Sequence, residues 1–224
     1  MKKKTTKGSG KTAKRPRRSS AESARVSCNA VFLVGFMGAG KTSVGRALAQ
    51  RLNWIFEDLD DRIVSRDGRT VAEIFRDAKE AGFRRAERAA LEQVLHELRG
   101  GVPKGAAGKI IALGGGAFVQ KENAALLKTF GVPTIFLDAP IEELWQRCRT
   151  QANETGAERP LLQSREQFGK LHATRRKSYS KAALKVQTGG RPVETIAAEI
   201  TKALGLKKIA PRTETLRIEE GEVE

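Results

Sequence analysis

The sequence predicts an α/β fold in which a central parallel β-sheet lies between two layers of helices, a three-layer α/β/α sandwich. Two observations predict this fold class. Short apolar runs alternate with segments of helical spacing along most of the chain, which is the pattern of parallel βαβ units. In addition, 224 residues with 39% hydrophobic composition supply one buried core plus tails, and they are too few for two full-sized domains.

The predicted strands are short apolar runs that end at glycine or at acidic residues. The first, Val31-Phe32-Leu33-Val34, leads directly into a glycine-rich turn, and the third, Lys109 to Leu113, runs into three consecutive glycines. We expect strands at 31–34, 54–56, 109–113, 133–137 and 184–188.

The predicted helices are segments in which apolar residues recur every three or four positions, as they do at Val44, Leu48 and Leu52. Residues 150–163 are mostly polar and lack a clear period, so we expect a mobile lid there. We expect further helices at 61–66, 70–77, 82–99, 121–130, 140–149, 164–182 and 192–204.

Charge is unevenly distributed along the chain, whose formal net charge is +16. Residues 1–25 hold ten Lys or Arg and one Glu, a local charge of +9, whereas residues 211–224 hold two Arg and five Glu, a local charge of −3. Subtracting both from the total leaves +10 for residues 26–210. This excess suits an anionic ligand as small as a phosphate and does not require nucleic acid.

These charges divide the chain into a domain and two extensions. Residues 1–27 carry almost no large apolar side chains, so we expect a disordered basic extension. An RNA-binding or localising arm is the alternative interpretation of this segment, and we expect no nucleic acid partner. Residues 28–208 form the folded domain, and residues 209–224 form an acidic tail.

The composition argues against several other classes of protein. The only cysteines, Cys28 and Cys148, and the only histidines, His96 and His172, have no metal-binding spacing, so we expect neither a zinc site nor a disulfide framework. No apolar run approaches 18 residues, and no hydrophobic stretch follows the basic N-terminus as in a signal peptide. We expect a soluble, cytoplasmic monomer without a membrane partner.

The segment GFMGAGKT at residues 35–42 matches the phosphate-binding pattern G-x-x-x-x-G-K-[ST], and it lies between a predicted strand and a predicted helix. Glycines let backbone N–H groups surround an anion at the helix N-terminus. We expect Lys41 to bind the β- and γ-phosphates of ATP and Thr42 to bind Mg²⁺. The predicted nucleotide-binding residues of this loop are Gly38, Ala39, Gly40, Lys41, Thr42 and Ser43.

Four further segments follow the phosphate loop in order: EDLDDRIVSRDGRTVAEIF at 57–75, GFRRAE at 82–87, LGGGA at 113–117 and RPLL at 159–162. With them, residues of about 30–205 resemble the shikimate kinase family. The resemblance implies a P-loop NTPase fold of the nucleoside-monophosphate-kinase-like type. It also implies ATP-dependent phosphorylation of the 3-hydroxyl of shikimate to 3-phosphoshikimate, a step toward chorismate and the aromatic amino acids.

The resemblance implies roles for individual residues of the acceptor site. Asp58 helps to hold Mg²⁺, and Asp60 binds the shikimate hydroxyl that is phosphorylated and acts as its base. A carboxylate beside the acceptor can orient the oxygen and take its proton. Arg84, with Glu87 as its acidic partner, binds the shikimate carboxylate, since a guanidinium can donate two parallel hydrogen bonds. Gly115 also binds shikimate.

Three more arginines are assigned by the same resemblance. Arg159 corresponds to the lid arginine that stabilises charge on the transferred phosphoryl group, and Arg149 fits a second basic position at the start of the lid. Arg175 corresponds to a substrate arginine, but Arg176 is an alternative because Lys177 replaces a proline of the family pattern. Arg191 is expected near adenine.

Two other functions remain open at this point. A related P-loop kinase could phosphorylate gluconate or a nucleoside monophosphate, and a panel of acceptors distinguishes these from shikimate. A nucleotide sensor or nucleic-acid adaptor without catalysis is the alternative from another class. The joint presence of Lys41, Asp60, Arg84 and Arg159 argues against an adaptor, which needs no such set.

Overall fold

A computed structural model describes residues 30–102, 106–155 and 164–208. Within these ranges, one sheet of five parallel strands has the order β2-β3-β1-β4-β5. The strands are β1 (Ala30–Val34), β2 (Ile55–Asp58), β3 (Lys109–Ala112), β4 (Thr134–Asp138) and β5 (Leu184–Gln187). The helices are α1 (Lys41–Leu52), α2 (Leu59–Asp67), α3 (Val71–Arg99), the 3₁₀ turn η1 (Ala117–Val119), α4 (Lys121–Phe130), α5 (Ile141–Thr155), α6 (Arg165–Tyr179) and α7 (Val193–Ala203).

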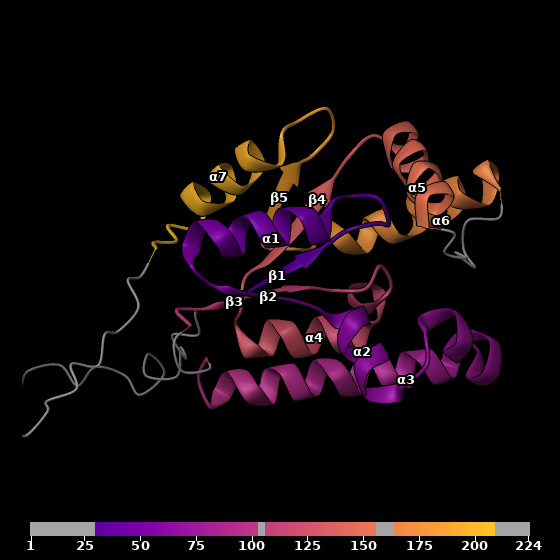
Figure 1. Cartoon of the computed structure of the whole chain (residues 1–224), viewed down its shortest axis with the longest axis horizontal. Helices are drawn as coiled ribbons and strands as arrows, with labels where there is room; N and C mark the ends of the chain where they lie inside the picture. Colours follow the sequence, from indigo (N-terminus) through magenta and orange to yellow (C-terminus); the bar gives the residue numbers. More distant parts are fainter. Residues whose placement is uncertain (1–29, 103–105, 156–163, 209–224) are drawn as a thin grey trace, which may run out of the picture.

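Helices cover both faces of the sheet. In Figure 1, α1 and α7 lie above the strands, and α2, α3 and α4 lie below them. All residues of β1, β3 and β4 are buried, and most of them are apolar, as expected for central strands that are covered on both faces. The predicted three-layer sandwich with a central parallel sheet is therefore confirmed.

The strand order places the ligand site. β1 lies at the centre of the sheet and pairs with β3 on one side and β4 on the other. The sheet therefore extends from β1 in both directions, to β3 and β2 on one side and to β4 and β5 on the other. Ligands of such sheets bind at the carboxyl ends of the strands beside this switch point. The phosphate loop, residues 35–42, lies there.

The region 70–99, for which the sequence predicts two helices, forms two helical segments joined by a sharp kink within α3. Lys79, at the kink, has φ 58° and ψ −175°, which is not a helical conformation. The first segment begins with a capping box, in which Thr70 and Glu73 bind each other's backbone N–H groups. The kink sets the first segment at a different angle from the second.

One helix is longer than the sequence predicts. We expected a helix at 140–149 and a polar lid at 150–163, but α5 continues to Thr155. Its last turns are exposed to solvent, so the sequence there shows no apolar spacing that would indicate a helix. The rest of the predicted lid, residues 156–163, lies outside the described residues.

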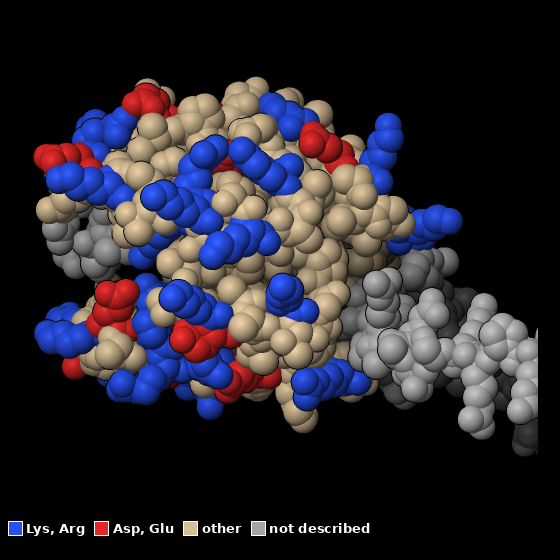
Figure 2. Space-filling view, turned by 180° about the vertical axis from the view of Figure 1, so that it is seen from behind, with Lys and Arg blue, Asp and Glu red and all other residues tan. Residues whose placement is uncertain are grey.

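The described surface is rich in positive charge. In Figure 2, Lys and Arg side chains outnumber acidic ones over the upper half of the face shown, while the two signs are mixed over the lower half. This distribution agrees with the excess of basic residues counted for the body of the chain. Among the described helices, none is both long and apolar enough to cross a membrane.

Candidate active site

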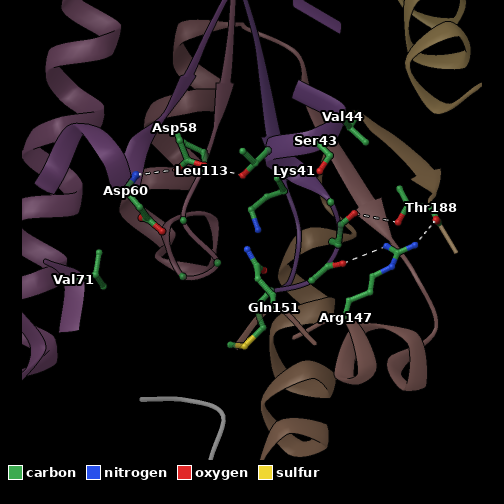
Figure 3. A pocket seen from close by; sticks show the side chains of 18 of the residues that line it. Lys41, Ser43, Val44, Asp58, Asp60, Val71, Leu113, Arg147, Gln151 and Thr188 are labelled. Carbon is green, nitrogen blue, oxygen red and sulfur yellow. Dashed lines mark hydrogen bonds between the residues drawn. The ribbon is translucent and has the colours of Figure 1, made fainter. Parts of the chain in front are cut away.

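A cavity of about 840 Å³ lies at the carboxyl ends of the strands and is lined by the phosphate loop and by residues of α2, α3, α5, α6 and α7. This volume lies within the range of small-molecule sites. In Figure 3, Asp58 and Asp60 lie on one side of Lys41, and Arg147 and Thr188 lie on the other. Apart from Arg149 and the alternative Arg176, the described residues that the sequence predicts for the site all line the cavity: Gly38, Ala39, Gly40, Lys41, Thr42, Ser43, Asp58, Asp60, Arg84, Gly115, Arg175 and Arg191.

The phosphate loop presents backbone donors to this cavity. Gly40, with φ 88°, is the residue that precedes α1. Because glycine has no side chain, it makes no capping hydrogen bond to the first turn of the helix. The first N–H groups of α1 are therefore available to an anion, which the helix dipole also favours. Lys41 Nζ donates to the carbonyls of Gly35 at 3.0 Å and Phe36 at 3.2 Å, so its charge lies across the loop.

Glycine is required within the loop by the close approach of α5. Gly38 has φ 78°, and a Cβ atom there would lie 2.8 Å from the Leu144 carbonyl oxygen and 3.0 Å from Cys148 Sγ. Any side chain at this position would have to displace the backbone of α5. The loop and α5 are thus packed directly against each other.

Thr42 and Asp58 form the part of the site that suits a magnesium ion. Thr42 Oγ1 donates to Asp58 Oδ2 at 3.1 Å, and Asp58 Oδ1 accepts from the backbone N–H of Asp60 at 3.1 Å as the cap of α2. Burial raises the pKa of Asp58 above its ordinary value. One carboxylate and one hydroxyl beside the phosphate loop match the few protein ligands that Mg²⁺ uses when nucleotide phosphates complete its shell. These two residues therefore fit the ion.

Asp60 lines the cavity, and one of its carboxylate oxygens has no hydrogen-bond partner within the described part of the chain. Among the described residues, Oδ1 of Asp60 is one of three buried side-chain polar atoms without a hydrogen-bond partner. Burial, with the neighbouring Asp58 charge, raises the pKa of Asp60 to about 6. A buried oxygen that lacks a donor is costly unless a ligand supplies one. The atom is placed to accept a hydrogen bond from a substrate hydroxyl.

A second unsatisfied carboxylate oxygen lies close to the first. Glu87 is fully buried, and its Oε2 atom accepts from Arg84 at 2.8 Å while Oε1 has no partner. Burial raises the pKa of Glu87 to about 7, and the adjacent Arg84 charge opposes this rise. Arg84 also binds Glu80 at 3.0 Å, at the exposed edge of the site. The sequence analysis named Glu87 only as the partner of Arg84.

The three glycines after β3 make room for these side chains. A Cβ atom at Gly114 would lie 2.5 Å from Asp60 Oδ1 and 3.0 Å from Glu87 Oε1, and one at Gly116 would lie 2.2 Å from the Arg84 guanidinium. At Gly115, the nearest atom, on Arg175, would be 3.6 Å away. The sequence analysis selected Gly115, but the steric requirement for glycine is strongest at Gly114 and Gly116.

Arg175, and not Arg176, points into the site. Arg175 is 7% exposed, lines the cavity and donates to the Gly115 carbonyl at 3.3 Å, where Tyr179 also donates its hydroxyl. Arg176 instead donates two hydrogen bonds to buried Asp138, at 3.2 and 2.7 Å, and does not line the cavity. Successive residues of α6 point in different directions, so only one of them reaches the site.

The opposite end of the cavity contains basic residues of α5 and of the loop before α7. Arg191 lines it, with its guanidinium bound to the Gln187 carbonyl at 2.8 Å and to Glu199 at 2.5 Å. The second basic position expected at Arg149 is wrong, because Arg149 does not line the cavity and Arg147 does. Arg159 lies outside the described residues, so its place in the lid stays a prediction.

Arg147 connects two loops that the sequence does not relate. Its guanidinium donates to the carbonyls of Gly38 at 3.3 Å and Thr188 at 3.2 Å, while the Thr188 hydroxyl donates to the Ala39 carbonyl at 3.2 Å. Arg147 lies within the predicted helix 140–149, but the sequence does not show which face of that helix lies against the phosphate loop, so it did not identify this residue.

Apolar residues of α3 form one wall of the cavity, which the sequence analysis also missed. The lining includes Val71, Ala72, Phe75 and Phe83, and the rings of Phe75 and Phe83 lie 4.6 Å apart. These residues follow the helical spacing of α3, and periodicity alone cannot distinguish such a wall from an ordinary core face. The site therefore combines an apolar wall with arginines and carboxylates.

Comparisons with known proteins agree with this geometry. A family model described as shikimate kinase matches residues 37–205. The shikimate kinase of Geobacter metallireducens is 40% identical over 182 residues, which cover 80% of this chain and 93% of that protein. The shikimate kinase of Persephonella marina is 34% identical over 171 residues, covering 76% of this chain and 95% of that protein.

Solved structures give the same result. Shikimate kinase from Acinetobacter baumannii in complex with shikimate matches with a TM-score of 0.68 and 31% identity, and covers 80% of this chain and 93% of that chain. The enzyme from Aquifex aeolicus matches with a TM-score of 0.62 and 32% identity, over 79% and 96% of the two chains. By the family model, the relatives and the shared fold, the chain belongs to the shikimate kinase family.

Proposed function

We propose that this protein transfers the γ-phosphoryl group of ATP to the 3-hydroxyl of shikimate, giving 3-phosphoshikimate and ADP. One observation carries the proposal: the phosphate loop shares a single cavity with two buried, unsatisfied carboxylate oxygens and two arginines. A polyol with a carboxylate satisfies all of these groups, because its hydroxyls donate hydrogen bonds and its carboxylate accepts them from guanidinium groups. This chemistry describes shikimate.

The acceptor is held by groups from three elements. Arg84 of α3 and Arg175 of α6 bind the shikimate carboxylate, and the N–H groups at Gly114–Gly116 lie beside the ring. Asp60 accepts the hydrogen bond of the reacting hydroxyl, since its Oδ1 atom is buried and without a partner. The apolar wall of α3 packs on the ring face. Gluconate lacks a rigid ring to fill this wall, so we expect it to be a poor acceptor.

The nucleotide occupies the phosphate loop. The N–H groups of Gly38–Ser43 and the Lys41 ammonium bind the phosphates, and Arg191 lies near the base. Thr42 and Asp58 hold Mg²⁺, which when bound neutralises charge on the β- and γ-phosphate oxygens. Arg159, by its place in the family pattern, adds positive charge at the transferred group when the lid closes.

In the reaction, side chains of the protein accept one proton and stabilise the negative charge on the transferred phosphoryl group. The shikimate hydroxyl gives its proton to the Asp60 carboxylate while its oxygen forms a bond to the γ-phosphorus. The bond from that phosphorus to the β–γ bridging oxygen breaks, and ADP leaves with the electron pair. Lys41 and Arg159 stabilise the charge that develops on the phosphoryl oxygens.

The test is an acceptor panel with the purified full-length protein. ADP release is measured with ATP and Mg²⁺ alone and with shikimate, gluconate or a nucleoside monophosphate added. We expect release to rise only with shikimate. A rise with another acceptor and none with shikimate would overturn the substrate assignment.

A matched pair of variants tests the role of Asp60. We expect Asp60→Asn to lower kcat by about 10²- to 10⁴-fold, the usual contribution of a general base. Asp61→Asn is the control, because Asp61 is exposed and does not line the cavity. Equal activity of the two variants would remove Asp60 from the mechanism. A cytoplasmic location and a monomeric state stay predictions from the sequence.

A further inference from the structure

A closed ring of four charged side chains lies behind the acceptor site and does not touch the cavity. Glu57 of β2 pairs with Arg62 of α2 and with Lys109 of β3, and Glu97 of α3 pairs with the same two cations. The ring thus contains two anions and two cations, from four different elements. None of the four residues lines the substrate cavity.

Three members of the ring are largely buried, and Glu97, whose side chain is 39% exposed, lies at its outer edge. The side chains of Arg62 and Glu57 are 17% exposed, and that of Lys109 is 7% exposed. Arg62 binds both carboxylate oxygens of Glu97, NH1 to Oε1 at 2.7 Å and NH2 to Oε2 at 2.8 Å. Bidentate arginine–carboxylate pairs fix relative orientation as well as distance. This pair therefore sets the position of α2 against α3.

Each member of the ring is close in sequence to a residue that the mechanism uses, or lies on the same element. Glu57 immediately precedes Asp58, and Arg62 follows Asp60 by two positions. The turn that carries both catalytic carboxylates is thus held at each end. Lys109 begins the strand that leads to the glycines after β3, and Glu97 lies on the helix that carries Arg84.

The three segments of the acceptor site are therefore connected at their base by this ring. A cleft of about 1000 Å³ lies on the other side of Asp58 from the substrate cavity, and Glu57, Arg62 and Glu97 line it. Leu59 and Ile63 anchor the turn and α2 in the hydrophobic core, and on the side of the cleft the ion pairs of Glu57 and Arg62 add a second set of contacts. Small displacements of a reacting group reduce rates strongly.

We propose that the Glu57–Arg62–Glu97–Lys109 ring is a positioning device that holds Asp60 against the reacting hydroxyl, with Arg62 as its key member. The inference rests on the proposed function and deepens it. Arg62 touches no substrate and is a positioning residue. Its loss displaces the carboxylates of the turn relative to the acceptor, while the phosphate loop, which is held by β1, α1 and α5, keeps its structure.

The experiment compares Arg62→Met, Arg62→Lys and the double variant Arg62→Met/Glu97→Gln with the wild-type full-length protein. Methionine keeps the length of the side chain without charge, and the double variant leaves Lys109 with Glu57 as a neutral pair. Initial rates are measured with shikimate and ATP at a temperature at which circular dichroism shows every variant to be folded. Arg66→Met is the control, since exposed Arg66 lines the same cleft and makes only a 3.5 Å bond to Gln93.

We expect Arg62→Met to lower kcat about tenfold, with the KM for ATP within twofold of wild type. Arg62→Lys should recover part of kcat, because it restores charge without the bidentate pair. The double variant should regain stability in urea unfolding but not kcat. Arg66→Met should match the wild type.

Two results would overturn the proposal. The first is a double variant that regains full kcat together with stability. The ring would then only neutralise charges and would not position Asp60. The second is an Arg62→Met variant with wild-type kcat. Failure of the proposed function is distinct from both, since it would leave the wild-type protein itself without shikimate-dependent ADP release.

Discussion

At the scale of single residues, two adjacent arginines of α6 have different tasks. Arg175 lines the cavity and binds the Gly115 carbonyl, whereas Arg176 and Lys185 neutralise the buried carboxylate of Asp138. The sequence TRRKS left the choice between the two arginines open. Only the packing of α6 against the sheet decides it, because one residue along a helix rotates a side chain by about 100°.

Substitution separates these two tasks. We expect Arg175→Ala to raise the KM for shikimate by at least about tenfold, since a lost charge-assisted hydrogen bond costs about 1.5–3 kcal/mol. The KM for ATP should change little. Arg176→Ala should leave both KM values near wild type and lower the free energy of unfolding, because it leaves the buried carboxylate of Asp138 with Lys185 as its one ion-pair partner among the described residues. Steady-state kinetics with urea unfolding checks both, and reversed effects would exchange the assignments.

The buried carboxyl of Glu87 makes stability depend on pH. Its pKa is raised to about 7, above the ordinary 4.5, so the folded chain holds a proton that the unfolded chain has released. The stabilisation from this proton is present below pH 4.5 and is lost as the pH rises through 7. Between pH 4.5 and 7.5 we expect this group to remove up to about 3 kcal/mol from the free energy of unfolding.

Glu87→Gln should remove the part of this dependence that lies between pH 6 and 7.5, because glutamine does not titrate, and should leave the part due to Asp60, whose pKa is about 6. The measurement is urea unfolding of both proteins at several pH values from 4.5 to 8. Glu80→Gln is the control, since Glu80 binds Arg84 from the exposed side and is 67% exposed. It should keep the wild-type slope. Parallel curves for Glu87→Gln and wild type would show that Glu87 does not hold the proton.

At the scale of elements, the kink in α3 stores backbone strain. Lys79, with φ 58° and ψ −175°, occupies a region that essentially only glycine adopts without strain, at a cost of about 1–3 kcal/mol. The Lys79 side chain makes one exposed bond, to the Arg76 carbonyl at 3.2 Å. The kink separates Val71 and Phe75, on the first segment, from Arg84, on the second, and residues of both segments line the cavity.

Glycine at this position should relieve the strain. We expect Lys79→Gly to raise the free energy of unfolding by about 1 kcal/mol, which is the relief of strain less the cost of the greater conformational entropy that glycine gives the unfolded chain. Lys79→Ala, which loses the same exposed bond but keeps a Cβ, should show no such gain. Urea unfolding of the three proteins tests this, and equal loss of stability in both variants would contradict it.

The elements show how far sequence reasoning reaches. Apolar runs placed all five described strands within two residues, because central strands of a parallel sheet are apolar on both faces. The end of α5 could not be predicted in this way, since its last turns face solvent and their composition is polar. Arg147, Val71 and Phe75 were missed for a different reason. They belong to helices whose orientation in the fold is set by tertiary packing, which the sequence does not show.

At the scale of the whole molecule, the described lining of the cavity comes from residues that are far apart in the sequence. The lining residues extend from Met37 to Ile196. Within the described lining, the positive charge available to the nucleotide comes from Lys41, Arg147 and Arg191, and Arg84 and Arg175 supply that of the acceptor site.

A chain limited to residues 28–208 should therefore keep its activity. We expect kcat and both KM values within about twofold of the full chain in the same ADP-release assay. Any salt-dependent binding of RNA by the full chain should be lost in this shorter form, because it would depend on the charge of residues 1–25. A tenfold fall in kcat on truncation would instead assign the extensions a part in catalysis.

The direction of the strands has a practical meaning for handling this enzyme. β1 starts at Ala30 at the amino ends of the strands, away from the cavity, and α7 runs back antiparallel to the strands, so it ends on that same side of the molecule (Figure 1). Both attachment points are therefore remote from where reactants enter. Tethering to a bead or fusing a reporter at either end should leave the mouth of the cleft open to solution.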